Sequence, residues 1–105
     1  MSFEIIPTSN FEKELKILAK KYPNIKRDIK NLEKDLEKNP QQGHPLSKSC
    51  YKIRMKITGK SAGKRGGARI ITFVKVIGEK VYLLSIYDKA DQANNEELDN
   101  LLKYL

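Results

Sequence analysis

Apolar residues follow a helical period in the first part of the chain and an alternating period in the second. The helical spacing runs from Phe11 to Tyr22 and again from Ile25 to Leu36. Ser9, with Glu12 three residues later, has the spacing of a capping box, and Pro23 can begin the second helix. The pattern predicts an antiparallel pair of helices whose apolar stripes pack into the core.

Sequence patterns typical of strands lie before and after this helical region. Four strands are predicted, over residues 3–6, 51–57, 68–77 and 81–87. The stretch 68–77 is apolar on both faces, as expected of a central strand. The short connection at 78–80 indicates antiparallel pairing with the strand that follows.

A final helix is expected near the C-terminus, capped by Asn94 or Asn95 and carrying its leucine stripe from Leu98 to Leu105. The predicted order is therefore β-α-α-β-β-β-α. At 105 residues the chain is expected to form one domain, residues 1–105. The predicted fold is α+β, a small and mainly antiparallel sheet with helices packed on one face.

The charge of the chain is concentrated in its central segment. The net charge is +8, and residues 38–78 hold ten basic residues and no acidic one. Such a partitioned field attracts an anionic partner, most often nucleic acid. A basic surface kept only for solubility is the alternative, but it would scatter lysines along the chain.

Alternation places Lys52, Arg54 and Lys56 on the sheet face that the helices leave open. Arg69, at the start of the central strand, can join them there. Clustered cations repel one another, and phosphates would neutralise them. An arginine fork grips phosphate oxygens at two points, which lysine cannot do. A solvated edge strand, protected by its charges against aggregation, is the alternative interpretation.

Metal sites and hydrolytic triads cannot be recognised in the sequence, and we expect neither a metal nor a cofactor. His44 is the only histidine, and we expect a surface turn residue there, with a general base as the alternative. Cys50 is the only cysteine, expected as a buried thiol in a reducing cytoplasm. The chain shows no signal peptide and no apolar stretch of the ~20 residues that span a bilayer, so a cytoplasmic protein without membrane contact is expected.

Three segments together resemble the RelE/ParE superfamily of toxins from bacterial toxin–antitoxin modules. They are the basic strand at 52–56, the segment KRGGARII at 64–71 with the Gly/Lys-rich stretch before it, and YLLSIYDK at 82–89. The closest likeness is to the HigB-type branch, whose members are ribosome-dependent endoribonucleases that cut mRNA. The resemblance implies the RelE-like microbial RNase architecture, a helix-turn-helix antitoxin as partner, and the ribosome with its mRNA as target.

The resemblance also implies site residues. Catalytic roles fall on Arg54, Lys56, Arg69, Tyr87 and Lys89. We also expect basic residues of this region to contact RNA or the ribosome, namely Lys48, Lys52, Lys60, Lys64 and Arg65. The resemblance implies the last two of these, Lys64 and Arg65.

RNA chemistry agrees with this reading without depending on it. The 2′-hydroxyl of RNA can attack the adjacent phosphate, so the protein must orient the attack and stabilise the charge that develops. We expect Arg54 and Arg69 to stabilise that charge. Tyr87, or a lysine such as Lys56 or Lys89, would transfer protons, and the sequence leaves the general base open.

Two other functions remain open from the sequence. The ParE-like branch of the same superfamily inhibits DNA gyrase by protein contact, and a non-catalytic RNA-binding module would carry the same charge. A gyrase inhibitor has no evident need for Lys52, Arg54 and Lys56 on one face, which favours the nuclease.

Overall fold

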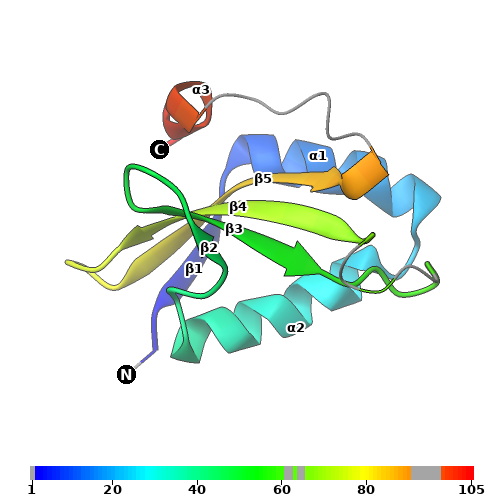
Figure 1. Ribbon diagram of the computed structural model, residues 1–105, viewed down its shortest axis with the longest axis horizontal. Coiled ribbons are helices and arrows are strands. Elements are labelled where there is room, and N and C mark those ends of the chain that lie inside the picture. The colour runs from blue at the N-terminus through cyan, green and yellow to red at the C-terminus, as the bar shows by residue number, and fades with distance from the viewer. Residues whose placement is uncertain (1, 61–62, 64–65, 91–97) are drawn as a thin grey trace.

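The fold is a mixed five-stranded sheet with two long helices on one face and a short helix on the other (Figure 1). The computed structural model describes residues 2–60, 63, 66–90 and 98–105. No helix within these residues is long and apolar enough to cross a membrane. The elements are β1 (Glu4–Pro7), α1 (Ser9–Lys21), α2 (Ile25–Lys38), β2 (His44–Pro45), β3 (Cys50–Met55), β4 (Ala68–Lys75), β5 (Lys80–Asp88) and α3 (Leu98–Leu102).

The predicted α+β fold class is confirmed, and the sheet has one further strand and one parallel pairing. The strand order is β1-β5-β4-β3-β2, and β3, β4 and β5 pair antiparallel as predicted. β1 pairs with β5 in parallel, which makes the sheet mixed. β2 is not among the strands predicted from the sequence, and it pairs with β3 over only two residues. A run that short, containing a proline, has no alternating pattern to reveal it.

Helix α1 begins one residue earlier than the capping-box spacing predicts. The N-cap is Thr8, whose hydroxyl oxygen accepts a hydrogen bond from the Phe11 amide at 3.3 Å. The same hydroxyl donates to the Leu83 carbonyl at 2.8 Å. Thr8 takes the cap position over Ser9 because its hydroxyl joins the helix to β5 as well as capping it.

Side chains of α1 also form hydrogen bonds with the backbone groups at the edge of β5 beyond the end of β1. β1 pairs with β5 only as far as Leu83. Past that point Asn10 donates to the Leu84 carbonyl at 2.9 Å, and a Glu14 carboxylate oxygen accepts from the Ile86 amide at 3.3 Å. These bonds replace a missing strand, since buried backbone groups need partners. They hold α1 against the part of β5 that leads to the site described below.

Helix α3 packs on the face that the sequence predicts to be open. Leu101 is 1% exposed and packs with Cys50, Ile71 and Leu84 in a second, smaller core. A shift in the β4–β5 register between Ile71 and Thr72 leaves Leu84 as an extra residue, which contributes to this cluster. The third helix therefore departs from the prediction of helices on one face. Its predicted cap, Asn94 or Asn95, lies outside the described residues.

Candidate nucleic-acid interface

Three predicted catalytic residues form a row across the three central strands. Arg54 of β3 lies directly opposite Arg69 of β4, and Arg69 lies directly opposite Tyr87 of β5. Residues that face each other across an antiparallel ladder point to the same side of the sheet. The row is therefore on the face opposite α1 and α2, at the end of the sheet where β3 and β5 finish and β4 begins (Figure 1).

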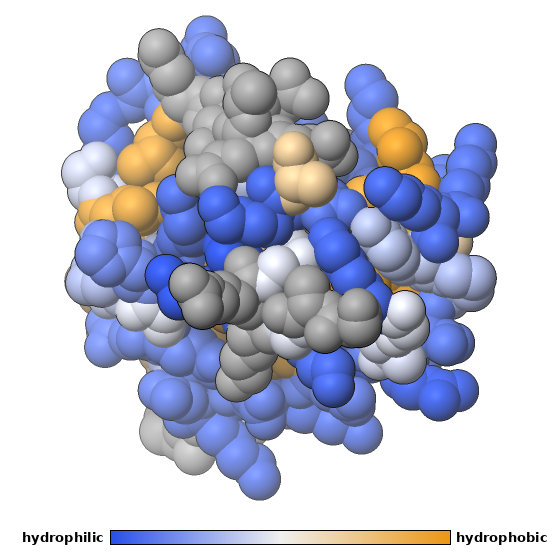
Figure 2. All heavy atoms as spheres, turned by 45° about the vertical axis from the view of Figure 1, so that its right-hand side comes forward, coloured by the Kyte–Doolittle hydropathy of each residue, from blue (hydrophilic) through white to orange (hydrophobic). Residues whose placement is uncertain are grey.

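A hollow of about 580 Å³ opens beside this row. Figure 2 brings this end of the molecule forward, and hydrophilic side chains dominate the surface there. The residues that line the hollow, which we call the cationic pocket, are Gln42, Gly43, His44, Lys52, Ile53, Arg54, Arg69 and Lys89. Among the described residues, four of the eight that line the pocket are basic and none is acidic, as a phosphate-binding surface requires.

Arg69 is the buried member of the row. Only 5% of the residue is exposed, and its Nη1 donates to the Ala68 carbonyl at 3.2 Å. Burial lowers the pKa of the Arg69 guanidinium and the neighbouring Arg54 charge lowers it further, while Tyr87 acts in the opposite direction. Arginine still stays protonated at neutral pH. Two guanidinium groups thus face one side of the sheet, and an anion placed over them would relieve their repulsion.

His44 lines the cationic pocket, although the sequence analysis assigned it to a surface turn. β2 pairs with β3 so that His44 stands opposite Lys52. Gly43 makes this approach possible, since its φ is +99° and a Cβ there would lie 2.6 Å from the Lys52 carbonyl oxygen. This pairing places His44, which the sequence left as an alternative general base, beside the basic residues of the cationic pocket. Its placement depends on strand pairing, which no local pattern indicates.

Tyr87 borders a second hollow next to the cationic pocket. This hollow measures about 190 Å³ and shares Lys52 with the cationic pocket. Leu46, Ile71 and Leu101 supply apolar walls. Tyr87 is half-buried and packs against the α3 side of the sheet. The predicted site thus has a cationic half and an adjoining apolar half, with Tyr87 and Lys52 near their boundary.

Other predicted site residues lie elsewhere. Lys56 is exposed and lines a separate groove with Arg54 and two acidic residues of α2, Asp28 and Asp35. Lys48 forms an ion pair with Asp99 of α3, away from the cationic pocket. Lys64 and Arg65 lie outside the described residues. Within the described part of the chain, no three His, Cys, Asp or Glu residues group as metal ligands.

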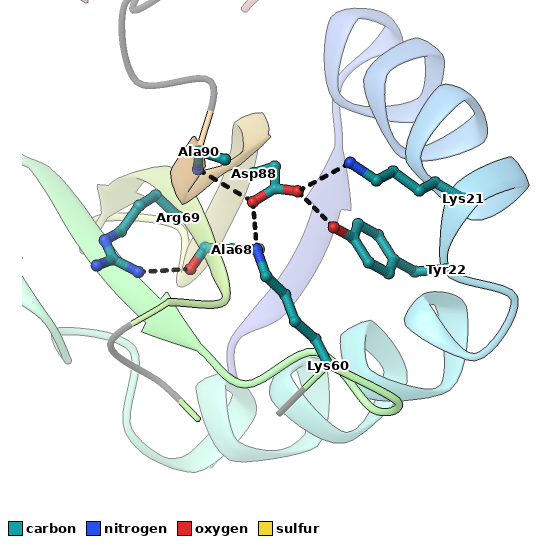
Figure 3. Close-up of polar contacts among 7 residues, drawn as sticks. All are labelled: Lys21, Tyr22, Lys60, Ala68, Arg69, Asp88 and Ala90. Carbon is teal, nitrogen blue, oxygen red and sulfur yellow. Dashed lines mark hydrogen bonds and ion pairs between the residues drawn. The ribbon is translucent and has the colours of Figure 1, made fainter. Parts of the chain in front are cut away.

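Lys60 has a protein partner that the sequence did not indicate. Its ammonium lies 2.8 Å from Oδ1 of Asp88, whose side chain is 0% exposed (Figure 3). The hydrogen bond to Asp88 raises the pKa of Lys60. Asp88 also accepts from the Tyr22 hydroxyl at 2.6 Å and from the Ala90 amide at 3.1 Å. Lys21 approaches the same carboxylate at 3.9 Å. We call these groups the Asp88 network.

Acid should weaken the fold through Asp88. Burial raises the pKa of the Asp88 carboxyl, but the hydrogen bonds from Lys60, Tyr22 and the Ala90 amide outweigh burial and lower it to about 2. A carboxyl with a lowered folded-state pKa stabilises the fold above its unfolded pKa, and this stability is lost as pH falls through the folded pKa. We expect the wild type to gain roughly 2 kcal/mol of unfolding free energy from about pH 2 to about pH 5 that Asp88→Asn does not gain. Urea unfolding at each pH measures this, and parallel acid profiles would contradict it.

Comparison with known proteins supports the fold. No family model matches the chain, and no curated protein matches it. Among solved structures, a free-state mutant of the E. coli toxin RelE superposes with a TM-score of 0.61 at 17% sequence identity, covering 99% of this chain and 94% of that one. The chain therefore has a RelE-like fold.

Proposed function

We propose that this protein is the toxin of a toxin–antitoxin module and an endoribonuclease that cleaves mRNA on the translating ribosome. The observation that carries the proposal is the Arg54–Arg69–Tyr87 row at the edge of a pocket lined by four basic residues. The RelE-like fold supports it at the level of architecture. The assignment to the HigB-type branch rests on the sequence resemblance.

The proposed reaction is an internal transfer at one phosphate. The 2′-oxygen forms a bond to phosphorus, its proton passes to a base, and the bond to the 5′-oxygen breaks as that oxygen gains a proton. The products are a 2′,3′-cyclic phosphate and a 5′-hydroxyl end. Arg54 and Arg69 stabilise the negative charge that builds on the phosphate oxygens, because both guanidinium groups stand ready on one face of a rigid sheet.

Proton transfer is assigned to groups at or beside the cationic pocket. Lys89 and His44 line the pocket, and Tyr87 lies opposite Arg69. Lys56, the other lysine proposed from the sequence, lies in the groove beside α2 and ranks behind them. Each proton-transfer group contributes roughly 10²–10⁴ in rate.

Two macromolecular partners follow from the proposal. The ribosome presents RNA phosphates to the cationic pocket and to the basic connection that contains Lys64 and Arg65. A helix-turn-helix antitoxin would silence the toxin through an acidic or helical segment laid over the same face. Charge complementarity supports both partners, because acidic residues are absent from positions 38–78.

Mapping of mRNA 5′ ends after brief induction of the toxin tests the function. We expect new ends inside translated codons, each with a 5′-hydroxyl. DNA damage signalling without mRNA cleavage would replace the proposal with gyrase inhibition. Binding of RNA with no new ends would replace it with a non-catalytic module.

A further inference from the structure

Asp88 is a buried charge between two residues of the proposed site. Its neighbours Tyr87 and Lys89 belong to the site, with Tyr87 opposite Arg69 and Lys89 in the cationic pocket. Asp88 pairs with Ala68, and its carboxylate contacts Tyr22 at the C-terminal end of α1. Successive strand residues point to opposite faces, so Asp88 points away from the substrate side. A role in contacting RNA is thereby excluded for its side chain.

The Asp88 carboxylate joins the end of β5 to two segments that are distant in sequence (Figure 3). Lys60 comes from the connection between β3 and β4, Tyr22 from the end of α1, and the Ala90 amide from the turn after β5. Hydrogen bonds to a charged group in a dry site are among the stronger ones in proteins. Removing one partner of such a set leaves the remaining buried charge uncompensated.

The connection between β3 and β4 is held at further points close to Lys60. Asp28 of α2 accepts hydrogen bonds from the Thr58 amide at 2.8 Å and from the Thr58 hydroxyl at 2.5 Å. At the other end of the connection, the Lys89 amide donates to the Gly67 carbonyl at 2.9 Å. Arg69 follows two residues after Gly67. The connection is therefore held by hydrogen bonds at Thr58 and at Gly67, just before the chain enters β4 and reaches Arg69.

We propose that Asp88 is a positioning residue that anchors the basic connection through Lys60 and thereby sets where Arg69 and Lys89 stand toward the RNA. The inference rests on the proposed function. It assigns Lys60 to the protein framework and leaves RNA contact to the pocket residues and to Lys64 and Arg65. The Asp88 carboxylate already compensates the charge of the Lys60 ammonium, so Lys60 neutralises no phosphate and adds nothing to the release of counterions from the RNA.

The experiment compares Asp88→Asn, Lys60→Met and the double variant with Lys103→Met, which removes one exposed lysine elsewhere. Hydrogen exchange is followed at the amides of residues 58–60 and 66–67. Losing a hydrogen bond to a charged group should speed exchange there roughly ten- to a hundredfold. Lys103→Met should leave these rates unchanged. Unchanged exchange in Asp88→Asn would overturn the anchor.

Kinetics and salt dependence then separate positioning from RNA contact. The probes are ribosomes programmed with a translated message and a labelled single-stranded RNA. We expect Lys60→Met to lower the cleavage rate at saturating ribosomes about tenfold or more while the slope of log affinity against log salt stays that of the wild type. The double variant should be no worse than the poorer single variant, because both remove one shared interaction. A slope reduced by about one, or additive losses, would make Lys60 an RNA contact instead.

The outcomes also separate this inference from the proposed function. A wild type that neither binds nor cleaves RNA defeats the function, while hydrogen exchange and the double-variant cycle in stability still decide the anchor. A wild type that cleaves, with Asp88→Asn cleaving equally well, defeats the inference alone. Tyr22→Phe removes the 2.6 Å hydroxyl bond to Asp88 and the contact of the same hydroxyl with Lys60 but leaves the Asp88 charge in place, so it supplies the same exchange test in a milder form if Asp88→Asn fails to fold.

Discussion

Arg69→Lys should abolish detectable mRNA cleavage while the protein stays folded. Lysine keeps the positive charge but loses the planar fork that can hold two phosphate oxygens. Removal of one preorganised donor to a developing anion costs on the order of 10²–10³ in rate, about 3–4 kcal/mol. Single-turnover cleavage of ribosome-bound message measures the loss, and a co-purified antitoxin and an unchanged melting temperature report on the fold.

Lys75→Ala is the matched control for Arg69. Lys75 is an exposed basic residue at the far end of the same strand, so its loss lowers the net charge without touching the cationic pocket. We expect that variant to cleave like the wild type. If Arg69 instead holds the hairpin in place, Arg69→Ala would lose melting temperature in step with activity. Full cleavage by Arg69→Ala at normal expression would end the catalytic assignment.

Gly67→Ala should cause a large loss of stability because two backbone segments touch at this glycine. A Cβ at Gly67 would lie 2.1 Å from the Met55 carbonyl oxygen, a distance that only a backbone shift can relieve. We expect a loss of more than about 4 kcal/mol, in the range reserved for severe changes. In a protein of this size that amounts to a fall of roughly 15 °C or more in melting temperature, measured by circular dichroism.

Gly59→Ala separates the contact from the general effect of replacing a glycine. Gly59 has a φ of +94°, but no atom lies within 4 Å of a Cβ built there. Its replacement should cost only the roughly 1–2 kcal/mol of a left-handed conformation. Equal melting temperatures for the two variants would show that β3 and the start of β4 can move apart at little cost. The position of Arg69 at the start of β4 would then not be fixed by this contact.

The fold could be predicted from the sequence where a period repeats over several turns or strand residues. The helical stripe of α2 supplies the buried Ile25 and Leu36, and the apolar run of β4 supplies the buried Ile70. In both cases burial follows from local periodicity, since each element must bury its apolar face. The two-residue strand β2 escaped prediction. The α3 face was assigned wrongly, because Leu101 can pack on either side of the sheet until Cys50 and Ile71 offer it a surface.

The charged residues show the same division more sharply. Alternation predicted that Lys52 and Arg54 share a face, because their spacing alone decides it. Local spacing does not distinguish Lys60 from its neighbour Lys64, yet Lys60 pairs with Asp88, 28 residues away. The charge of a lysine is present in the sequence, but its partner depends on which segments the fold brings together.

By itself the sequence determined the periodic elements, the concentration of positive charge in residues 38–78 and the cationic face of β3, because these depend on near neighbours. Only the tertiary structure decided that Arg54, Arg69 and Tyr87 form one row, since that row requires the registers of two strand pairs. The pairing of β2 with β3 likewise brought His44 to the pocket. The packing of the C-terminal end of α1 beside β5 buried Asp88 and gave its carboxylate the Tyr22 hydroxyl as a partner. Register and burial are properties of the folded chain, because they depend on contacts between residues far apart in sequence.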